Sequence, residues 1–80
     1  MSIDRLRGVF REVFEDPQLE ISPSTTALDV PAWDSFNHIN LVIAIETEFN
    51  VRFKTKEIAD MANVGDLVTL LRKKGTDVSW

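Results

Sequence analysis

Apolar residues recur along the first segment of the chain at the spacing of a helix. The segment runs from Ile3 to Phe14, and its apolar positions fall on one helical face: Ile3, Leu6, Val9, Phe10, Val13 and Phe14. Ser2 is placed to cap the beginning of this helix. Asp16-Pro17 should end it, because a residue before proline is pushed out of the helical conformation. The pattern therefore predicts an amphipathic helix that buries one face.

The next segment, residues 17–33, has the composition of a loop. It holds all three prolines of the chain and a cluster of serine and threonine at residues 22–26. This is longer than most connections between helices. Four apolar residues are spaced through it: Leu19, Ile21, Leu28 and Val30. We expect a long loop that these residues anchor to the core.

The second predicted helix begins at Ser35 and ends at Phe49 or Asn50, with Asp34 as its N-cap and Trp33 packing against His38. It carries two apolar stripes. One stripe is formed by His38, Leu41, Val42, Ile45 and Phe49, and the other, nearly opposite, by Phe36, Ile39 and Ile43 beside Glu46. In so small a domain only one stripe can face the core, so the other is either covered by a second contact or meets a partner protein.

Two further helices complete the pattern. Thr55 can cap a short helix that continues to Met61 and turns Ile58, Met61 and Ala62 inward. Asn63 and Asp66 can cap a last helix that ends at Gly75 and buries Val64, Leu67, Val68 and Leu71. No alternating strand pattern occurs. The sequence predicts an all-α four-helix bundle at residues 1–75, with a long first loop, a short third helix and a flexible tail at residues 76–80.

The composition restricts the class of protein. Eighty residues make one domain, and there is no cysteine to form a disulfide. The chain shows no secretory signal and no apolar run long enough to span a bilayer, so we expect a soluble, cytoplasmic monomer. Residues 12–51 hold eight acidic residues and no lysine or arginine. This charge favours partners with basic surfaces and argues against nucleic acid.

The candidate chemistry centres on Ser35. His38 lies three residues further along the same helix, so a serine hydrolase built on this pair is one alternative. Four short helices imply no oxyanion hole, and a single histidine gives no metal-ligand spacing. A second alternative is that Ser35 is an ordinary early-helix residue. The third is that Ser35 is modified, because a helix N-terminus is a favourable place for an attached phosphate.

At Asp34-Ser35-Phe36 the chain resembles the acyl carrier protein family. The resemblance extends from about Ile3 to Gly75 and includes the helix order, a first loop with an anchoring leucine like Leu28, and the apolar stretch at residues 40–49. It implies a four-helix bundle in which a phosphopantetheinyl transferase esterifies Ser35 with 4′-phosphopantetheine, with Asp34 as the flanking motif residue. The thiol of this arm then carries an acyl group as a thioester.

The resemblance also implies which surface partner enzymes recognise. The transferase, an acyl-loading ligase or synthase, and acyltransferases would use their basic surfaces to bind the second helix. The matching positions are Phe36, Ile39, Ile43, Glu46 and Glu48.

The chain departs from the family pattern near the serine. Ala32 stands where glycine is usual, Trp33 where a small residue is commoner, Phe36 where leucine is usual, and Asn40 where an acid is frequent. These differences favour a specialised stand-alone carrier over the main carrier of fatty-acid synthesis. An aminoacyl, D-alanyl or peptidyl carrier would use the same arm. An unmodified helical interaction module is the alternative from another class.

Overall fold

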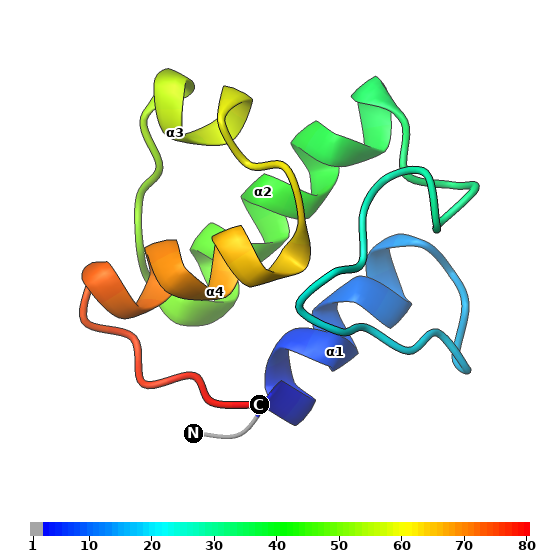
Figure 1. Cartoon of the computed structure of the whole chain (residues 1–80), viewed down its shortest axis with the longest axis horizontal. Helices are drawn as coiled ribbons and strands as arrows, with labels where there is room; N and C mark the ends of the chain where they lie inside the picture. The colour runs from blue at the N-terminus through cyan, green and yellow to red at the C-terminus, as the bar shows by residue number, and fades with distance from the viewer. Residues whose placement is uncertain (1–2) are drawn as a thin grey trace.

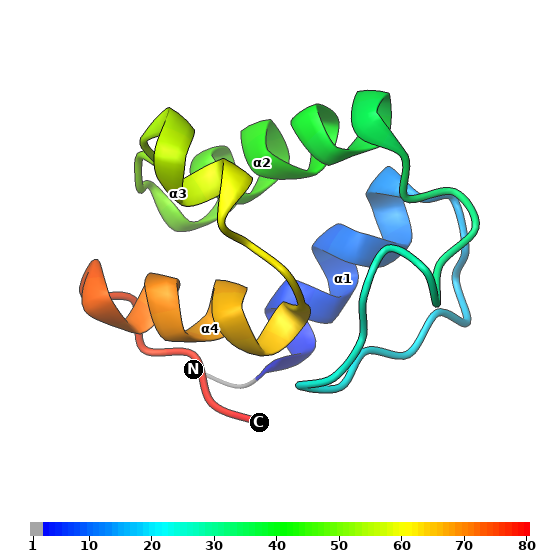
Figure 2. The ribbon, with the colours of Figure 1, turned by 45° about the horizontal axis from the view of Figure 1, so that its top comes forward.

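The computed structural model describes residues 3–80, and its regular elements in that range are four helices (Figure 1). They are α1 (Ile3–Val13), α2 (Ser35–Phe49), α3 (Thr55–Ala59) and α4 (Val64–Lys73). Figure 2 shows α2 lying over α1, with α3 and α4 on the other side of the molecule from the long connection between α1 and α2. The predicted all-α fold, with a long first loop and a short third helix, is confirmed. None of the helices described is long and apolar enough to cross a bilayer.

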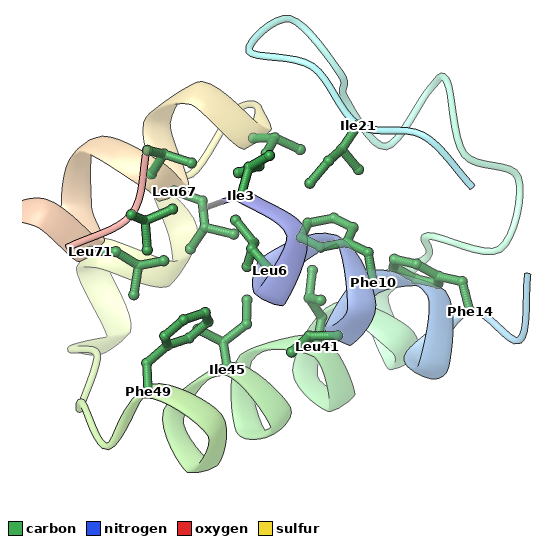
Figure 3. Packing of buried hydrophobic residues seen from close by; sticks show 14 of the residues in the cluster. Ile3, Leu6, Phe10, Phe14, Ile21, Leu41, Ile45, Phe49, Leu67 and Leu71 are labelled. Carbon is green, nitrogen blue, oxygen red and sulfur yellow. The ribbon is translucent and has the colours of Figure 1, made fainter. Parts of the chain in front are cut away.

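The core is formed by one face each of α1, α2 and α4. In Figure 3, Leu6 and Phe10 of α1 lie against Leu41 and Ile45 of α2, with Leu67 and Leu71 coming from α4. These six side chains are completely buried. The predicted apolar faces of the first and last helices are confirmed, as is the core stripe of α2 apart from His38, which is half-buried.

Three of the helices end in the same way, with a residue in the left-handed conformation. Glu15 after α1 has φ 53°, Asn50 after α2 has φ 54°, and Gly75 after α4 has φ 91°. At α1 the amide of Asp16 donates to the carbonyl of Arg11 at 3.0 Å, which closes the last turn. The helix therefore ends at Val13, before the predicted stop at Asp16-Pro17. The predicted cap at Ser2 lies outside the described residues.

The long loop is anchored at fewer points than the sequence suggested. Ile21 and Val30 are buried, and Leu19 packs against the core, as predicted. The prediction for Leu28 was wrong, because its side chain is 97% exposed. A hydrogen-bonded turn at residues 26–29 directs this leucine outward. The apolar spacing alone could not reveal the turn.

The C-terminal segment packs against the core through Val78, whereas the sequence predicted a flexible tail at residues 76–80. Val78 is 1% exposed and joins the hydrophobic cluster. The amide of Thr76 donates to the carbonyl of Leu71 at 3.0 Å, and Arg72 Nε donates to the carbonyl of Val78 at 2.7 Å. A single valine, followed by only two residues, gave no periodic signal from which this packing could be predicted.

The beginnings of α3 and α4 are capped differently. Lys54, not Thr55, precedes α3, and its amide donates to Glu57 Oε1 at 2.8 Å. This hydrogen bond and the Lys74 ammonium hold the pKa of the Glu57 carboxyl below its usual value. Helix α4 begins as predicted, with Asn63 Oδ1 accepting from the amide of Asp66 at 2.8 Å.

The predicted extent of the third helix was too long. It ends at Ala59 and does not reach Met61. Ile58 and Met61 are half-buried, whereas Ala62 is exposed. After the helix the amide of Ala62 donates to the Asp66 side chain of the next helix, at 3.2 Å.

Gly65→Ala is expected to destabilise the protein by about 1–3 kcal/mol, because overpacking forces the backbone to move. Gly65 donates its amide to the carbonyl of Pro23 at 3.0 Å, and a Cβ at this position would lie 2.8 Å from that oxygen. Gly8→Ala is the matched control: nothing lies within 4 Å of its Cβ position, so alanine should stabilise α1 by up to about 1 kcal/mol. Urea unfolding measures both, and equal midpoints for the two variants would contradict the expected close approach.

Candidate modification site

Ser35 is exposed and is the first residue of α2. Asp34 caps the helix as predicted: its Oδ1 accepts from the amide of Asn37 at 2.8 Å, and its carbonyl accepts from the amide of His38 at 2.8 Å. The amides of Ser35 and Phe36 come too early in the helix to have an intrahelical acceptor. The serine hydroxyl therefore lies at the positive end of a 15-residue helix dipole.

The backbone before Ser35 is held firmly. Asn37 Nδ2 donates to the carbonyl of Ala32 at 2.7 Å, and the amide of Trp33 donates to the carbonyl of Val30 at 2.9 Å. The Trp33 ring is buried against Phe10, with ring centroids 5.5 Å apart in an edge-on arrangement. Ser35 is thus exposed on a support that is itself part of the core.

Trp33 and His38 form a hydrogen-bonded pair, which confirms the predicted contact. Trp33 Nε1 donates to His38 Nδ1 at 3.0 Å, and the two rings stack with centroids 6.1 Å apart. Because His38 Nδ1 accepts this hydrogen bond, Nε2 carries the proton when the ring is neutral. Nε2 lies 3.4 Å from the carbonyl oxygen of Ile58. Both ring nitrogens are engaged by these contacts. The histidine is therefore not placed to act as a base for Ser35, which removes support from the hydrolase alternative.

An open hollow of about 510 Å³ lies beside Ser35, a size within the usual range for small-molecule sites. It is mainly apolar and is lined by residues of the first loop, α2 and the segment after α3: Ala27, Trp33, Asp34, Ser35, His38, Ile39, Met61 and Ala62. Sequence periodicity did not indicate this hollow, because it depends on how three separate segments meet.

The second apolar stripe of α2 faces outward. Phe36 is 75% exposed, Ile39 51% and Ile43 55%, whereas the opposite stripe is buried at Leu41, Val42, Ile45 and Phe49. Each of these three side chains is therefore at least half exposed, whereas core side chains of the described chain are less than a tenth exposed. Of the two possibilities for this stripe, the structure supports a surface available to a partner.

The two glutamates predicted to join this surface already have contacts within the chain. Glu46 is half-buried, and its Oε2 accepts from the amide of Phe53 at 2.8 Å. Glu48 pairs with Arg5 at 2.5 Å, although 42% of the Glu48 side chain stays exposed. Glu46 thus helps to fix the chain after α2, and Glu48 links α2 to α1. No group of three or more potential metal ligands gathers within residues 3–80.

The sequence and the fold match known proteins. A family model described as a phosphopantetheine attachment site matches residues 4–71. A Schizosaccharomyces pombe protein, described as a mitochondrial acyl carrier protein, is 29% identical over 59 residues; the match covers 74% of this chain but only 52% of that protein, about half its length. The solution structure of a holo acyl carrier protein from Geobacter metallireducens is 39% identical, covers 90% of this chain and 83% of its own, and has a TM-score of 0.85.

Proposed function

Because the chain belongs to the phosphopantetheine-attachment family of acyl carrier proteins, we propose that it carries acyl groups on a 4′-phosphopantetheine arm attached to Ser35. The observation that carries the proposal is the position of Ser35. It is an exposed hydroxyl at the first residue of α2, directly after the cap Asp34, inside the region that the family model matches.

The surroundings of Ser35 suit a phosphate ester and a long arm. A phosphate attached at the helix N-terminus would meet the positive end of the helix dipole and the amides that have no intrahelical acceptor. The mainly apolar hollow beside the serine offers a surface for an arm or for its cargo. The arm supplies the thiol that this cysteine-free chain lacks, and an acyl group is held on it as a thioester.

The attachment reaction asks little of the chain itself. Ser35 Oγ forms a bond to the phosphorus of the phosphopantetheine half of coenzyme A. The pyrophosphate P–O bond breaks, adenosine 3′,5′-bisphosphate leaves, and the transferase accepts the hydroxyl proton. The chain contributes a nucleophile held on a fixed backbone. In our proposal the chain is a substrate of other enzymes and not an enzyme itself. The position of His38 supports this, because both of its ring nitrogens contact other groups and neither is placed to act as a base for Ser35.

The exposed stripe of α2 is the surface that we assign to partner enzymes. Phe36, Ile39 and Ile43 provide apolar contact, and Asp34 and Glu46 add negative charge near it. Glu48, also predicted to join this surface, is paired with Arg5 on the side of α2 that faces α1. The partners would be the transferase, a loading ligase or synthase, and acyltransferases with basic surfaces. We propose a carrier for specialised metabolism that acts in the cytoplasm. An aminoacyl or D-alanyl cargo would use the same site.

The direct test of the proposal is a measurement of mass. The protein is incubated with coenzyme A and a broad-specificity phosphopantetheinyl transferase, and the intact mass is recorded. We expect a gain equal to one phosphopantetheine group, and fragmentation should place it on the peptide that contains Ser35. No gain, or a gain on another peptide, would overturn the assignment.

Ile43→Asp is expected to weaken transferase binding about tenfold, because it places a charge within an apolar contact. Asn40→Asp is the matched control. It adds the same charge at an exposed position of α2 that borders the stripe but is already polar, so no apolar contact is lost, and binding should be unchanged or slightly tighter. Titration calorimetry measures both variants. Equal weakening by the two would assign recognition to overall charge, and no weakening by Ile43→Asp would contradict the proposed surface.

A further inference from the structure

Leu28 has the highest exposure of the large apolar side chains in the described chain, at 97%. A single exposed leucine needs no explanation in general. The position of Leu28 is what makes it informative. Its neighbour Ala27 lines the same hollow as Ser35, together with Ile39 of the exposed stripe. Leu28 therefore lies on the loop side of the serine, and the apolar stripe lies on the helix side.

The turn that presents Leu28 is well defined by hydrogen bonds. The amide of Leu28 donates to Thr26 Oγ1 at 3.2 Å, and the amide of Asp29 donates to the carbonyl of Thr26 at 3.0 Å. Asp29 Oδ2 in turn accepts from the amide of Thr26 at 3.0 Å. Val30, the next residue, is buried and ties the turn to the core. An apolar side chain held in this way loses little backbone freedom when it enters a pocket.

We propose that Leu28 is a docking residue for the enzyme that attaches the arm to Ser35, and that it enters an apolar pocket bordered by lysine or arginine. This inference rests on the proposed function. It adds a second contact, supplied by the loop, to the recognition surface of α2.

The size of protein interfaces explains why the attaching enzyme is the expected partner. That enzyme must bring its active site onto Ser35 Oγ, and a standard interface covers about 800 Å² on each partner. This is about a sixth of the 4944 Å² surface of the described chain, and a patch of that area has a radius of roughly 16 Å. Centred on Ser35, it extends over both the loop and the helix side. Enzymes that act on the cargo at the far end of the arm need not place their active site at Ser35, so their interface need not be centred on it.

The charge around Leu28 supports a basic border on the partner. Asp29 and Asp34 are both exposed, one beside Leu28 and the other beside Ser35. No lysine or arginine occurs in residues 12–51, so nothing basic in this stretch offsets them. A partner with an apolar pocket and a positive rim would match both features, whereas a second copy of this acidic surface would be repelled.

The test compares Leu28→Ser with Trp80→Ser in the transferase reaction with coenzyme A, followed by intact mass. Trp80 is a matched control because it is 44% exposed and ends the chain away from the beginning of α2 (Figures 1 and 2). We expect Leu28→Ser to raise the apparent KM for the protein about 5- to 20-fold with kcat changed less than about twofold. Trp80→Ser should leave both values unchanged. The melting temperature of Leu28→Ser should stay that of the parent, since the side chain buries almost nothing.

Binding without chemistry gives an independent readout. The Kd of the transferase is measured for Ser35→Ala and for the double variant Ser35→Ala, Leu28→Ser, and the second should bind about 5- to 20-fold more weakly. If the parent protein is modified but Leu28→Ser leaves KM and Kd unchanged, the inference fails alone. An equal effect of Trp80→Ser would also overturn it. If the parent protein is not modified at all, the proposed function fails, and the inference falls with it.

Discussion

Ser35→Ala is expected to abolish the mass gain in the transferase reaction completely. The new bond is made to Oγ, and alanine offers no atom to replace it. The fold should not change, because the Ser35 side chain is exposed and the cap is provided by Asp34. Alanine is also a good residue for the first turn of a helix. Intact mass and a thermal melt of the same sample separate loss of the nucleophile from loss of structure.

Ser24→Ala provides the control for Ser35→Ala. Ser24 is an exposed serine of the first loop, and its hydroxyl lies 3.2 Å from that of Ser22. The Ser24→Ala variant should gain one phosphopantetheine group at Ser35, as the parent protein does. If Ser35→Ala still gained one phosphopantetheine group, the arm would be attached to another hydroxyl, and the site assigned from the position of α2 would be wrong.

One departure from the family pattern near Ser35, the tryptophan at position 33, is explained by a structural unit that it forms with His38. Trp33 replaces a smaller residue, but its ring fills space against Phe10 and Phe14 and its Nε1 is satisfied by His38. His38 in turn reaches the carbonyl of Ile58 at the end of α3. A buried tryptophan requires a hydrogen-bond partner, so the two residues make sense only together. This unit links the loop, α2 and α3 around the serine.

Local signals in the sequence predicted the helices and the position of Ser35 well. The cap at Asp34, the cap at Asn63 and the glycine that ends α4 each act through one or two neighbouring residues, so the sequence alone reveals them. Leu28 and Val78 were misjudged for the opposite reason. Whether a lone apolar residue is buried depends on turns and tertiary contacts that have no periodic pattern. The hollow beside Ser35 was missed on the same ground.

Two phenylalanines, Phe10 in the core face of α1 and Phe36 in the outward stripe of α2, allow a comparison of burial. Phe10→Ala is expected to destabilise the protein by about 3–5 kcal/mol, the usual cost of removing a buried aromatic ring. Phe10 is completely buried, and its ring contacts both Phe14 and Trp33 at centroid distances of 5.9 and 5.5 Å. At about 0.05–0.15 kcal/mol per residue, a chain of this size has about 4–12 kcal/mol of stability. The variant should therefore lose a large part of it.

Phe36→Ala removes the same ring from a position that is 75% exposed, and its stability should stay within about 0.5 kcal/mol of the parent protein. Urea unfolding followed by tryptophan fluorescence measures both variants, since Trp33 lies against the Phe10 ring. Transferase binding should respond in the opposite sense, weakened by Phe36→Ala but retained by the folded fraction of Phe10→Ala. Comparable destabilisation by the two substitutions would mean that Phe36 belongs to the core, and the outward stripe of α2 would then not be a surface for partners.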